Sequence, residues 1–154
     1  MKQNQFPHSV VAEIHLSYHP AVKPSQRPKV GTSVEVYNLF KDNWDTDRLE
    51  LQEQFKVMLL NRANRVLGIV EISSGGIAGT VADPKLIFAT ALKAGACSII
   101  LSHNHPSCQL KPSQADIALT RKISQGGQLL DISVLDHIIL TAEGYLSFAD
   151  EGLM

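Results

Sequence analysis

The sequence has too little cysteine for a disulfide-stabilised fold and no excess of either charge. Its two cysteines, Cys97 and Cys108, are too few for a disulfide framework and do not form a C-x-x-C pair. The 14 lysine and arginine residues and the 15 aspartate and glutamate residues give a formal net charge of −1. Proteins that hold nucleic acid through its phosphates usually carry a basic excess, so this balance weighs against dedicated nucleic-acid binding.

Long apolar runs are also missing. The longest apolar stretches fall far short of the ~20 residues that a helix needs to cross a bilayer. Residues 1–8 lack the apolar run of a signal peptide. We therefore expect a soluble protein of a reducing compartment, the cytoplasm, with no membrane partner. The 154 residues, of which 44% are hydrophobic, are enough to bury the core of one ordinary domain.

The apolar pattern predicts helices packed on a mixed sheet. Alternation predicts a half-buried strand at 9–18, and three prolines within 20–31 predict an extended arm. Helices are expected at about 33–43, 84–94 and 112–124, and strands at 53–60, 65–73, 97–102, 131–141 and 145–148. This order of elements indicates an α/β or α+β sandwich.

Turn and capping residues set the expected ends of these elements. Thr32 or Ser33 can cap the first helix, and Asp83 followed by Pro84 can open the second, which Gly95 would end. A short turn at 61–64 predicts an antiparallel hairpin. Gly126-Gly127 are expected to break or end the third helix near the following Leu129-Leu130.

The segment 103–116, HNHPSCQLKPSQAD, contains the densest chemistry. His103 and His105 are two residues apart, so in an extended backbone both imidazoles point to the same side. Asp116 lies in the first turn of the next helix, three residues after Ser113. If the helix start folds over the strand end, three nitrogen and oxygen ligands surround one position. Catalytic zinc is held in this way, with a water whose pKa falls to about 7 in the fourth place.

A site of this kind also needs a general base, usually a carboxylate. Four acids lie upstream in the predicted strand region: Asp47, Glu50, Glu53 and Glu71. Glu53 is the first choice because it shares a strand face with Phe55 and Val57, and a carboxylate on an apolar face costs energy unless something specific uses it. Glu71 is in phase with apolar neighbours too and is the second choice.

Each of these residues also has a simpler explanation. Ser113 could satisfy free N–H groups at a helix start, and Asp116 is an acid favoured by the helix dipole. The complete spacing H-x-H-x7-S-x2-D favours a metal site over these separate explanations. Cys108, in the adjoining loop, is an accessory ligand candidate because a thiolate binds zinc well. His137, inside an apolar strand, is interpreted as a core histidine or one that supports the site from behind.

These residues resemble the JAMM/MPN+ metalloprotease motif, an upstream Glu followed by H-x-H-x7-S-x2-D. More narrowly, the chain resembles the bacterial RadC-like JAB domains, through the stretches QEQFKVMLLN (52–61), HNHPS (103–107), PSQAD (112–116), VLDHIIL (134–140) and YLSF (145–148). The resemblance begins near residue 33. We therefore expect an N-terminal strand and Pro-rich arm over residues 1–32 and a RadC-like JAB/MPN domain over residues 33–154.

The resemblance implies a cytidine-deaminase-like α-β-α sandwich with a mixed central sheet. It implies a zinc ion, Zn2+, bound by His103, His105 and Asp116. Glu53 would be the acid/base, and Ser113 would stabilise the tetrahedral oxyanion. The implied enzyme is a zinc metallopeptidase of JAMM type, a hydrolase that cleaves a peptide or isopeptide bond in a protein substrate.

The sequence departs from the family pattern at two positions. Cys108 stands where the family usually has Gly after H-N-H-P-S, and Cys is strained there if the position requires φ > 0. Pro84-Lys85 replaces the family's Pro-Arg, which removes a bidentate donor. Neither change affects Glu53 or the H-x-H-x7-S-x2-D residues, so both bear more on the choice of substrate than on metal binding.

Parts of the sequence are also compatible with other classes of function. The chain could be a non-catalytic binding module, although silent MPN domains typically lack the metal ligands that this chain keeps. It could be a DNA-associated factor of a mobile element, since RadC-like proteins have a historical DNA-repair label and KPSQRPK (23–29) is locally basic. A base deaminase is excluded because H-x-E and P-C-x-x-C are missing. Self-association as a homo-oligomer is left open.

Overall fold

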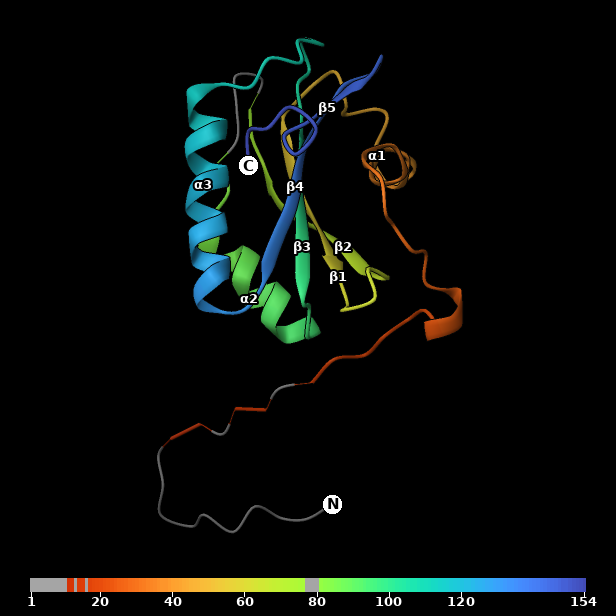
Figure 1. The fold of residues 1–154 in the computed structure, drawn as a ribbon, viewed down its shortest axis with the longest axis vertical. Helices are drawn as coiled ribbons and strands as arrows, with labels where there is room; N and C mark the ends of the chain where they lie inside the picture. The colour runs from red at the N-terminus through yellow and green to blue at the C-terminus, as the bar shows by residue number, and fades with distance from the viewer. Residues whose placement is uncertain (1–10, 13, 16, 77–80) are drawn as a thin grey trace.

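A five-stranded mixed sheet with helices on both faces forms the protein, as a computed structural model of residues 11–12, 14–15, 17–76 and 81–154 shows (Figure 1). The strands are β1 (Gln54–Leu60), β2 (Val66–Ser74), β3 (Ser98–Asn104), β4 (Ser133–Leu140) and β5 (Tyr145–Ser147). The helices are the 3-10 turn η1 (Pro24–Gln26), α1 (Ser33–Asp42), α2 (Pro84–Ala94) and α3 (Gln114–Leu129). The sheet order is β2-β1-β3-β4-β5. β3 and β4 are parallel, and the other neighbours are antiparallel.

The two faces of the sheet bury two separate hydrophobic cores. Successive side chains of a strand point to opposite faces, so β1 contributes Met58 to one core and Val57 to the other. α1 covers the first core through Phe40, whereas α2 and α3 cover the second. This arrangement is an α-β-α sandwich with a mixed central sheet, and it confirms the predicted fold class.

The capping residues act as the sequence predicts. The Thr32 side chain accepts a hydrogen bond from the backbone of Glu35, and the Glu35 carboxylate accepts one from the backbone of Thr32, which together form a capping box. Asp83 caps α2, and Gly95 ends it in the left-handed region with φ of 66°. Local chemistry therefore fixes where both helices begin and where α2 ends.

The third helix ends near Leu129-Leu130, as predicted, but Gly126-Gly127 do not break it. α3 continues through both glycines to Leu129. After the helix the chain folds back, and the backbone N–H of Ile132 donates to the carbonyl oxygen of Gly127 at 2.9 Å. A Cβ atom on Gly127 would collide with the carbonyl oxygen of Ile132. Gly127 is thus needed for a close backbone approach rather than as a helix stop.

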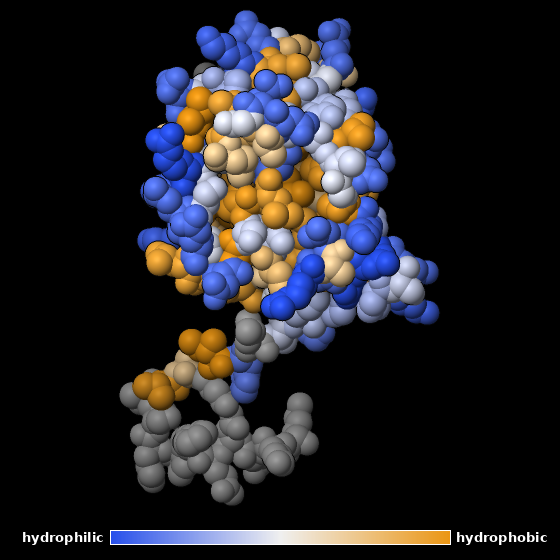
Figure 2. Space-filling model, in the orientation of Figure 1, coloured by the Kyte–Doolittle hydropathy of each residue, from blue (hydrophilic) through white to orange (hydrophobic). Residues whose placement is uncertain are grey.

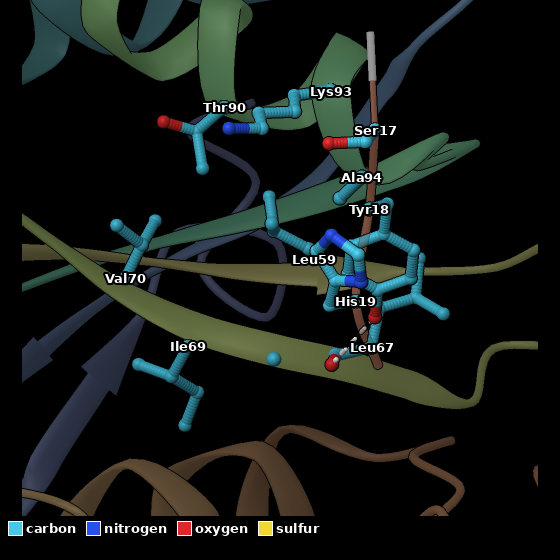
Figure 3. Close-up of a pocket in the computed structure, with 11 residues that line it drawn as sticks. Ser17, Tyr18, His19, Leu59, Leu67, Ile69, Val70, Thr90, Lys93 and Ala94 are labelled. Carbon is cyan, nitrogen blue, oxygen red and sulfur yellow. Dashed lines mark hydrogen bonds between the residues drawn. The ribbon is translucent and has the colours of Figure 1, made fainter. Parts of the chain in front are cut away.

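The predicted strand at 9–18 is wrong for the part of it that the structure describes. Residues 11, 12, 14, 15, 17 and 18 do not lie in a strand. Ile14 is 92% exposed and Tyr18 is 40% exposed, so the described part of the apolar side of the alternating segment lacks the burial that would hold a strand in place. Residues 17–19 instead run beside β2 and α2, where Tyr18 lies next to Leu67 (Figure 3).

The chain joins the sheet through residues 28–30. The N–H of Val30 donates to Asn64, the N–H of Val66 donates to Pro28, and Lys29 forms an isolated antiparallel bridge with Arg65. Hydrophobic side chains gather in the middle of the face on which β4 lies nearest the viewer, framed by hydrophilic ones (Figure 2). Among the helices of the described residues, none is long and apolar enough to span a membrane.

Candidate metal centre

The end of β3 supplies two imidazoles that point to the same place. β3 extends to Asn104, beyond the predicted end at residue 102, so His103 lies inside the strand and is only 1% exposed. His105 follows directly, and the Nε2 atoms of His103 and His105 are 2.9 Å apart. The spacing of two residues therefore does place both rings on one side, as an extended backbone requires.

The first turn of α3 brings a carboxylate to the same point. Asp116 Oδ1 lies 3.3 Å from His103 Nε2, and Asp116 Oδ2 lies 3.6 Å from His105 Nε2. Ser113 and Asp116 form a capping box at the start of the helix: the Ser113 N–H donates to Asp116 Oδ2 at 2.8 Å, and the Asp116 N–H donates to Ser113 Oγ at 3.0 Å. The cap orients the carboxylate toward the histidines.

Glu53, the residue directly before β1, completes the group. Its Oε1 lies 3.7 Å from His103 Nε2. One ligand atom from each of Glu53, His103, His105 and Asp116 lies within 4.8 Å of the others. The second-choice acid, Glu71, is outside this group; its carboxylate accepts a hydrogen bond from Ser74. The register argument that favoured Glu53 therefore identified the acid that reaches the histidines.

The donor atoms fit a metal ion. His105 Nδ1 lies 2.6 Å from the carbonyl oxygen of Gln109, which can only accept a hydrogen bond. Nδ1 must therefore be protonated, and the neutral ring has its lone pair on Nε2, facing His103. Two nitrogens that share a tetrahedral zinc ion at ~2.0–2.1 Å are about 3.3 Å apart, close to the 2.9 Å found here. Two imidazoles and a carboxylate form a ligand set typical of zinc.

The charges of the group differ strongly between its members. Burial alone would raise the pKa of Asp116, but the proximity of His103 and His105 outweighs it and holds that pKa well below its usual range. Burial raises the pKa of Glu53, in spite of the nearby histidines. The neighbouring Asp116 carboxylate raises the pKa of His105. Asp116 is thus the more acidic carboxyl of the group, while Glu53 is the carboxyl that takes up a proton more readily.

Asn104, between the two histidines in sequence, faces the opposite side. Its Nδ2 donates to the carbonyl oxygens of Leu49 at 2.7 Å and Gln52 at 2.9 Å, and its Oδ1 accepts from the N–H of Gln54 at 2.7 Å. These bonds hold the backbone on both sides of Glu53. At the end of β3, the two histidines therefore face the candidate metal centre, while Asn104 between them faces the other side of the sheet and holds the backbone around Glu53.

The other predicted site residues lie beside the group. Ser113 is the exposed N-cap of α3, so its structural role in the cap is seen directly, and its role at an oxyanion stays a prediction. Among the described residues that could share a metal, the group of four does not include Cys108. Cys108 has φ of 61°. This is the left-handed conformation in which the sequence comparison with the family expected strain.

Two further residues support His103, and the sequence argument found only one of them. His137 was interpreted as a core or supporting histidine; it is fully buried, its Nε2 lies 2.7 Å from His103 Nδ1, and burial lowers its pKa well below the usual range. Thr120, 2.6 Å from His137 Nδ1, was missed. Its position four residues after Asp116, on the same helix face, was the available signal.

Taken together, the fold and the group define an α/β domain with a candidate metal centre between the end of β3 and the start of α3. A family model described as the RadC-like JAB domain matches residues 30–153. The chain belongs to this family, as the sequence resemblance predicted.

The relatives are bacterial proteins that bear the name UPF0758. The protein of Flavobacterium johnsoniae is 50% identical over 101 residues, which cover 66% of this chain and 44% of the relative. The protein of Symbiobacterium thermophilum is 32% identical over 146 residues, 95% of this chain and 61% of the relative. The chain thus spans about half the length of the curated relatives it matches.

Proposed function

We propose that this protein is a zinc-dependent hydrolase of peptide or isopeptide bonds. The observation that supports the proposal is the convergence of His103, His105 and Asp116 on one point, with Glu53 beside them. His103, His105 and Asp116 would hold the ion. A bound zinc ion supplies a Lewis acid that polarises a carbonyl and makes water nucleophilic near neutral pH.

Glu53 would move the proton. Its pKa is raised by burial, which suits a group that accepts a proton from the attacking water and then donates it to the nitrogen of the leaving amine. In these steps the C–N bond breaks, the carbonyl carbon gains the water oxygen, and Glu53 returns to its carboxylate form. Asn104 keeps Glu53 in place through the backbone on either side.

Ser113 would contribute a hydrogen bond to the developing oxyanion. Its Oγ already accepts the N–H of Asp116, and this bond fixes the oxygen while the hydroxyl hydrogen serves as a donor. A fixed donor at a site of growing negative charge stabilises the transition state without reorganisation. The peptide or isopeptide-linked substrate would lie across the start of α3.

Metal content tests the first part of the proposal. The protein, purified without chelators, is expected to contain about one zinc ion per chain, as ligands of this type predict. His103→Ala and Asp116→Ala should each lose it, while His19→Ala, which changes an exposed histidine of the arm, should retain it. Wild-type protein that neither contains zinc nor binds it when zinc is added would contradict the metal site.

Hydrolysis tests the second part. Fluorogenic peptides and lysine-linked isopeptide conjugates are screened with the zinc-loaded protein, and Glu53→Gln serves as the blank. The variant is expected to retain zinc and to lose hydrolysis, because its amide cannot carry the proton. Equal turnover by both proteins would remove Glu53 from the mechanism, and zinc binding without turnover of any substrate would favour a non-catalytic domain.

A further inference from the structure

Behind His103, on the side away from Glu53 and Asp116, the structure contains a buried chain of hydrogen bonds. His103 Nδ1 lies 2.7 Å from His137 Nε2, and His137 Nδ1 lies 2.6 Å from Thr120 Oγ1. Thr120 Oγ1 in turn donates to the carbonyl oxygen of Asp116 at 2.7 Å. His103, His137 and Thr120 are at most 1% exposed, so water does not substitute for these partners.

One end of this series of hydrogen bonds is a group that can only accept, and this fixes which atom donates in each bond. The carbonyl oxygen of Asp116 has no hydrogen, so the single hydroxyl hydrogen of Thr120 points to it. Thr120 Oγ1 must then accept from His137 Nδ1–H. A buried imidazolium without a carboxylate partner is costly, so His137 is neutral, and its Nε2 has a lone pair. That lone pair accepts a hydrogen from His103 Nδ1.

We propose that Thr120 and His137 are positioning residues that hold His103 in the tautomer with hydrogen on Nδ1 and the lone pair on Nε2. The inference rests on the proposed metal site, because Nε2 is the atom that faces Glu53, His105 and Asp116. With Nε2 already unprotonated, no proton has to leave the ring before an ion binds. Partners that fix a ligand's tautomer in this way typically change metal affinity 10- to 100-fold.

Helix α3 supplies both the carboxylate that faces the histidines and the hydroxyl group that holds His137. Asp116 presents its carboxylate to the histidines, and its own carbonyl oxygen anchors Thr120 one turn later. A shift of α3 along the sheet would therefore disturb the carboxylate and the tautomer of His103 together. His137 connects this helix to β4, the parallel neighbour of β3.

The tautomer can be measured without metal. Long-range nitrogen–proton NMR correlations of the metal-free protein at pH 8, above the ordinary histidine pKa of ~6.5, report which ring nitrogen carries hydrogen. We expect His103 with hydrogen on Nδ1 and His137 with hydrogen on Nδ1. Hydrogen on His103 Nε2 in the wild type would overturn the proposal directly.

A pair of variants at Thr120 measures the effect on zinc. Thr120→Val keeps the shape and removes the hydroxyl, so His137 Nδ1–H loses its acceptor; Thr120→Ser keeps the hydroxyl. Competition with a chromogenic chelator is expected to show zinc bound at least ~10-fold more weakly by the valine variant. The serine variant should stay within about threefold of the wild type. NMR should show His103 moving toward hydrogen on Nε2 in the valine variant alone.

The outcomes separate this inference from the function on which it rests. Equal zinc affinity of the valine and serine variants, with the wild type binding zinc, would overturn the positioning role and leave the metal site intact. Failure of the wild type to bind zinc would overturn both. Urea denaturation of the two variants, with a similar free energy of unfolding, assigns a difference in affinity to the hydroxyl rather than to the stability of the fold.

Discussion

Asn104 fixes the position of Glu53 without contacting its side chain. The Asn104 amide accepts from the N–H of Gln54 and donates to the carbonyl oxygen of Gln52, the two residues that flank Glu53. Asn104 is completely buried, and the sheet face it occupies is opposite to the face of the candidate centre. Asn104 therefore holds the backbone of Glu53, the proposed proton carrier, from the opposite face of the sheet.

Asn104→Asp should loosen this loop, because a carboxylate cannot donate to the carbonyl oxygens of Leu49 and Gln52. Leaving buried groups without partners costs about 1–3 kcal/mol, measured as a drop in the free energy of unfolding in urea. Hydrogen exchange of the amides of residues 49–54 should speed up. Asn43→Asp is the matched control, since Asn43 donates to Leu39 at an exposed helix end. An equal loss of the free energy of unfolding in both variants would argue against this role of Asn104.

Cys108→Gly should stabilise the protein. Cys108 has φ of 61°, a conformation that costs an L residue roughly 1–2 kcal/mol. Part of the gain is offset because glycine loses more entropy on folding, so we expect the free energy of unfolding to rise by about 0.5–1 kcal/mol. Cys108→Ala, which keeps the strain, should stay near the wild type. A similar gain in the alanine variant would trace the effect to the thiol instead.

Gly127→Ala should destabilise the end of α3. The added methyl group would collide with the backbone oxygen of Ile132, which cannot turn away as a side chain can. Such overpacking costs about 1–3 kcal/mol. Gly126→Ala is the comparison, because its methyl group would meet only the ring of Phe88 and the helix gains from alanine. Thermal unfolding of both variants should show the larger loss at position 127; the reverse order would refute the close approach.

Asp136 should make stability depend on pH. Burial raises the pKa of this carboxyl, even though Ser147 and the backbone of Ala149 donate to it. A carboxyl with a raised pKa in the folded state stabilises the fold fully below its unfolded pKa of ~3.9 and loses this contribution as pH rises through the folded pKa.

The pH effect can be isolated with Asp136→Asn. In urea denaturation at several pH values from acidic to neutral, the wild type should lose free energy of unfolding relative to the asparagine variant as pH rises through that window. The variant cannot titrate at this position, so its own curve gives the background from all other groups. A constant difference between the two proteins at every pH would show that Asp136 ionises as it does in the unfolded chain.

The sequence predicted what short-range chemistry determines. Thr32 and Asp83 were recognisable as caps because their side chains bond to residues within one turn. The alternation around Glu53 also indicated the correct face of β1, since the period of a strand is fixed by its backbone. The sequence could not show that Gly127 lies against Ile132, because a helix stop and a close approach both use glycine.

Long-range relationships were harder to predict. The alternating segment at 9–18 indicates which side would be buried, but only the folded chain shows that Ile14 and Tyr18, on that side, remain exposed. Thr120 has a role only because α3 lies over the end of β3 and beside His137, a contact between residues 17 positions apart. The spacing of Thr120 from Asp116 predicts that the two residues share a helix face. It does not predict which strand this face packs against.

The position of β1 between β2 and β3 has a consequence for synthesis on the ribosome. The β1–β2 hairpin emerges first, and one edge of β1 then has no partner until residues 98–104 follow. All seven residues of β1 are buried in the finished sheet, and five of them are apolar, so the unpaired edge is able to pair with other chains. The hydrogen bond between His103 and His137 forms later still, after β4 has been synthesised. On the proposed positioning role, His103 would reach its full affinity for zinc only after β4 has joined the sheet beside β3.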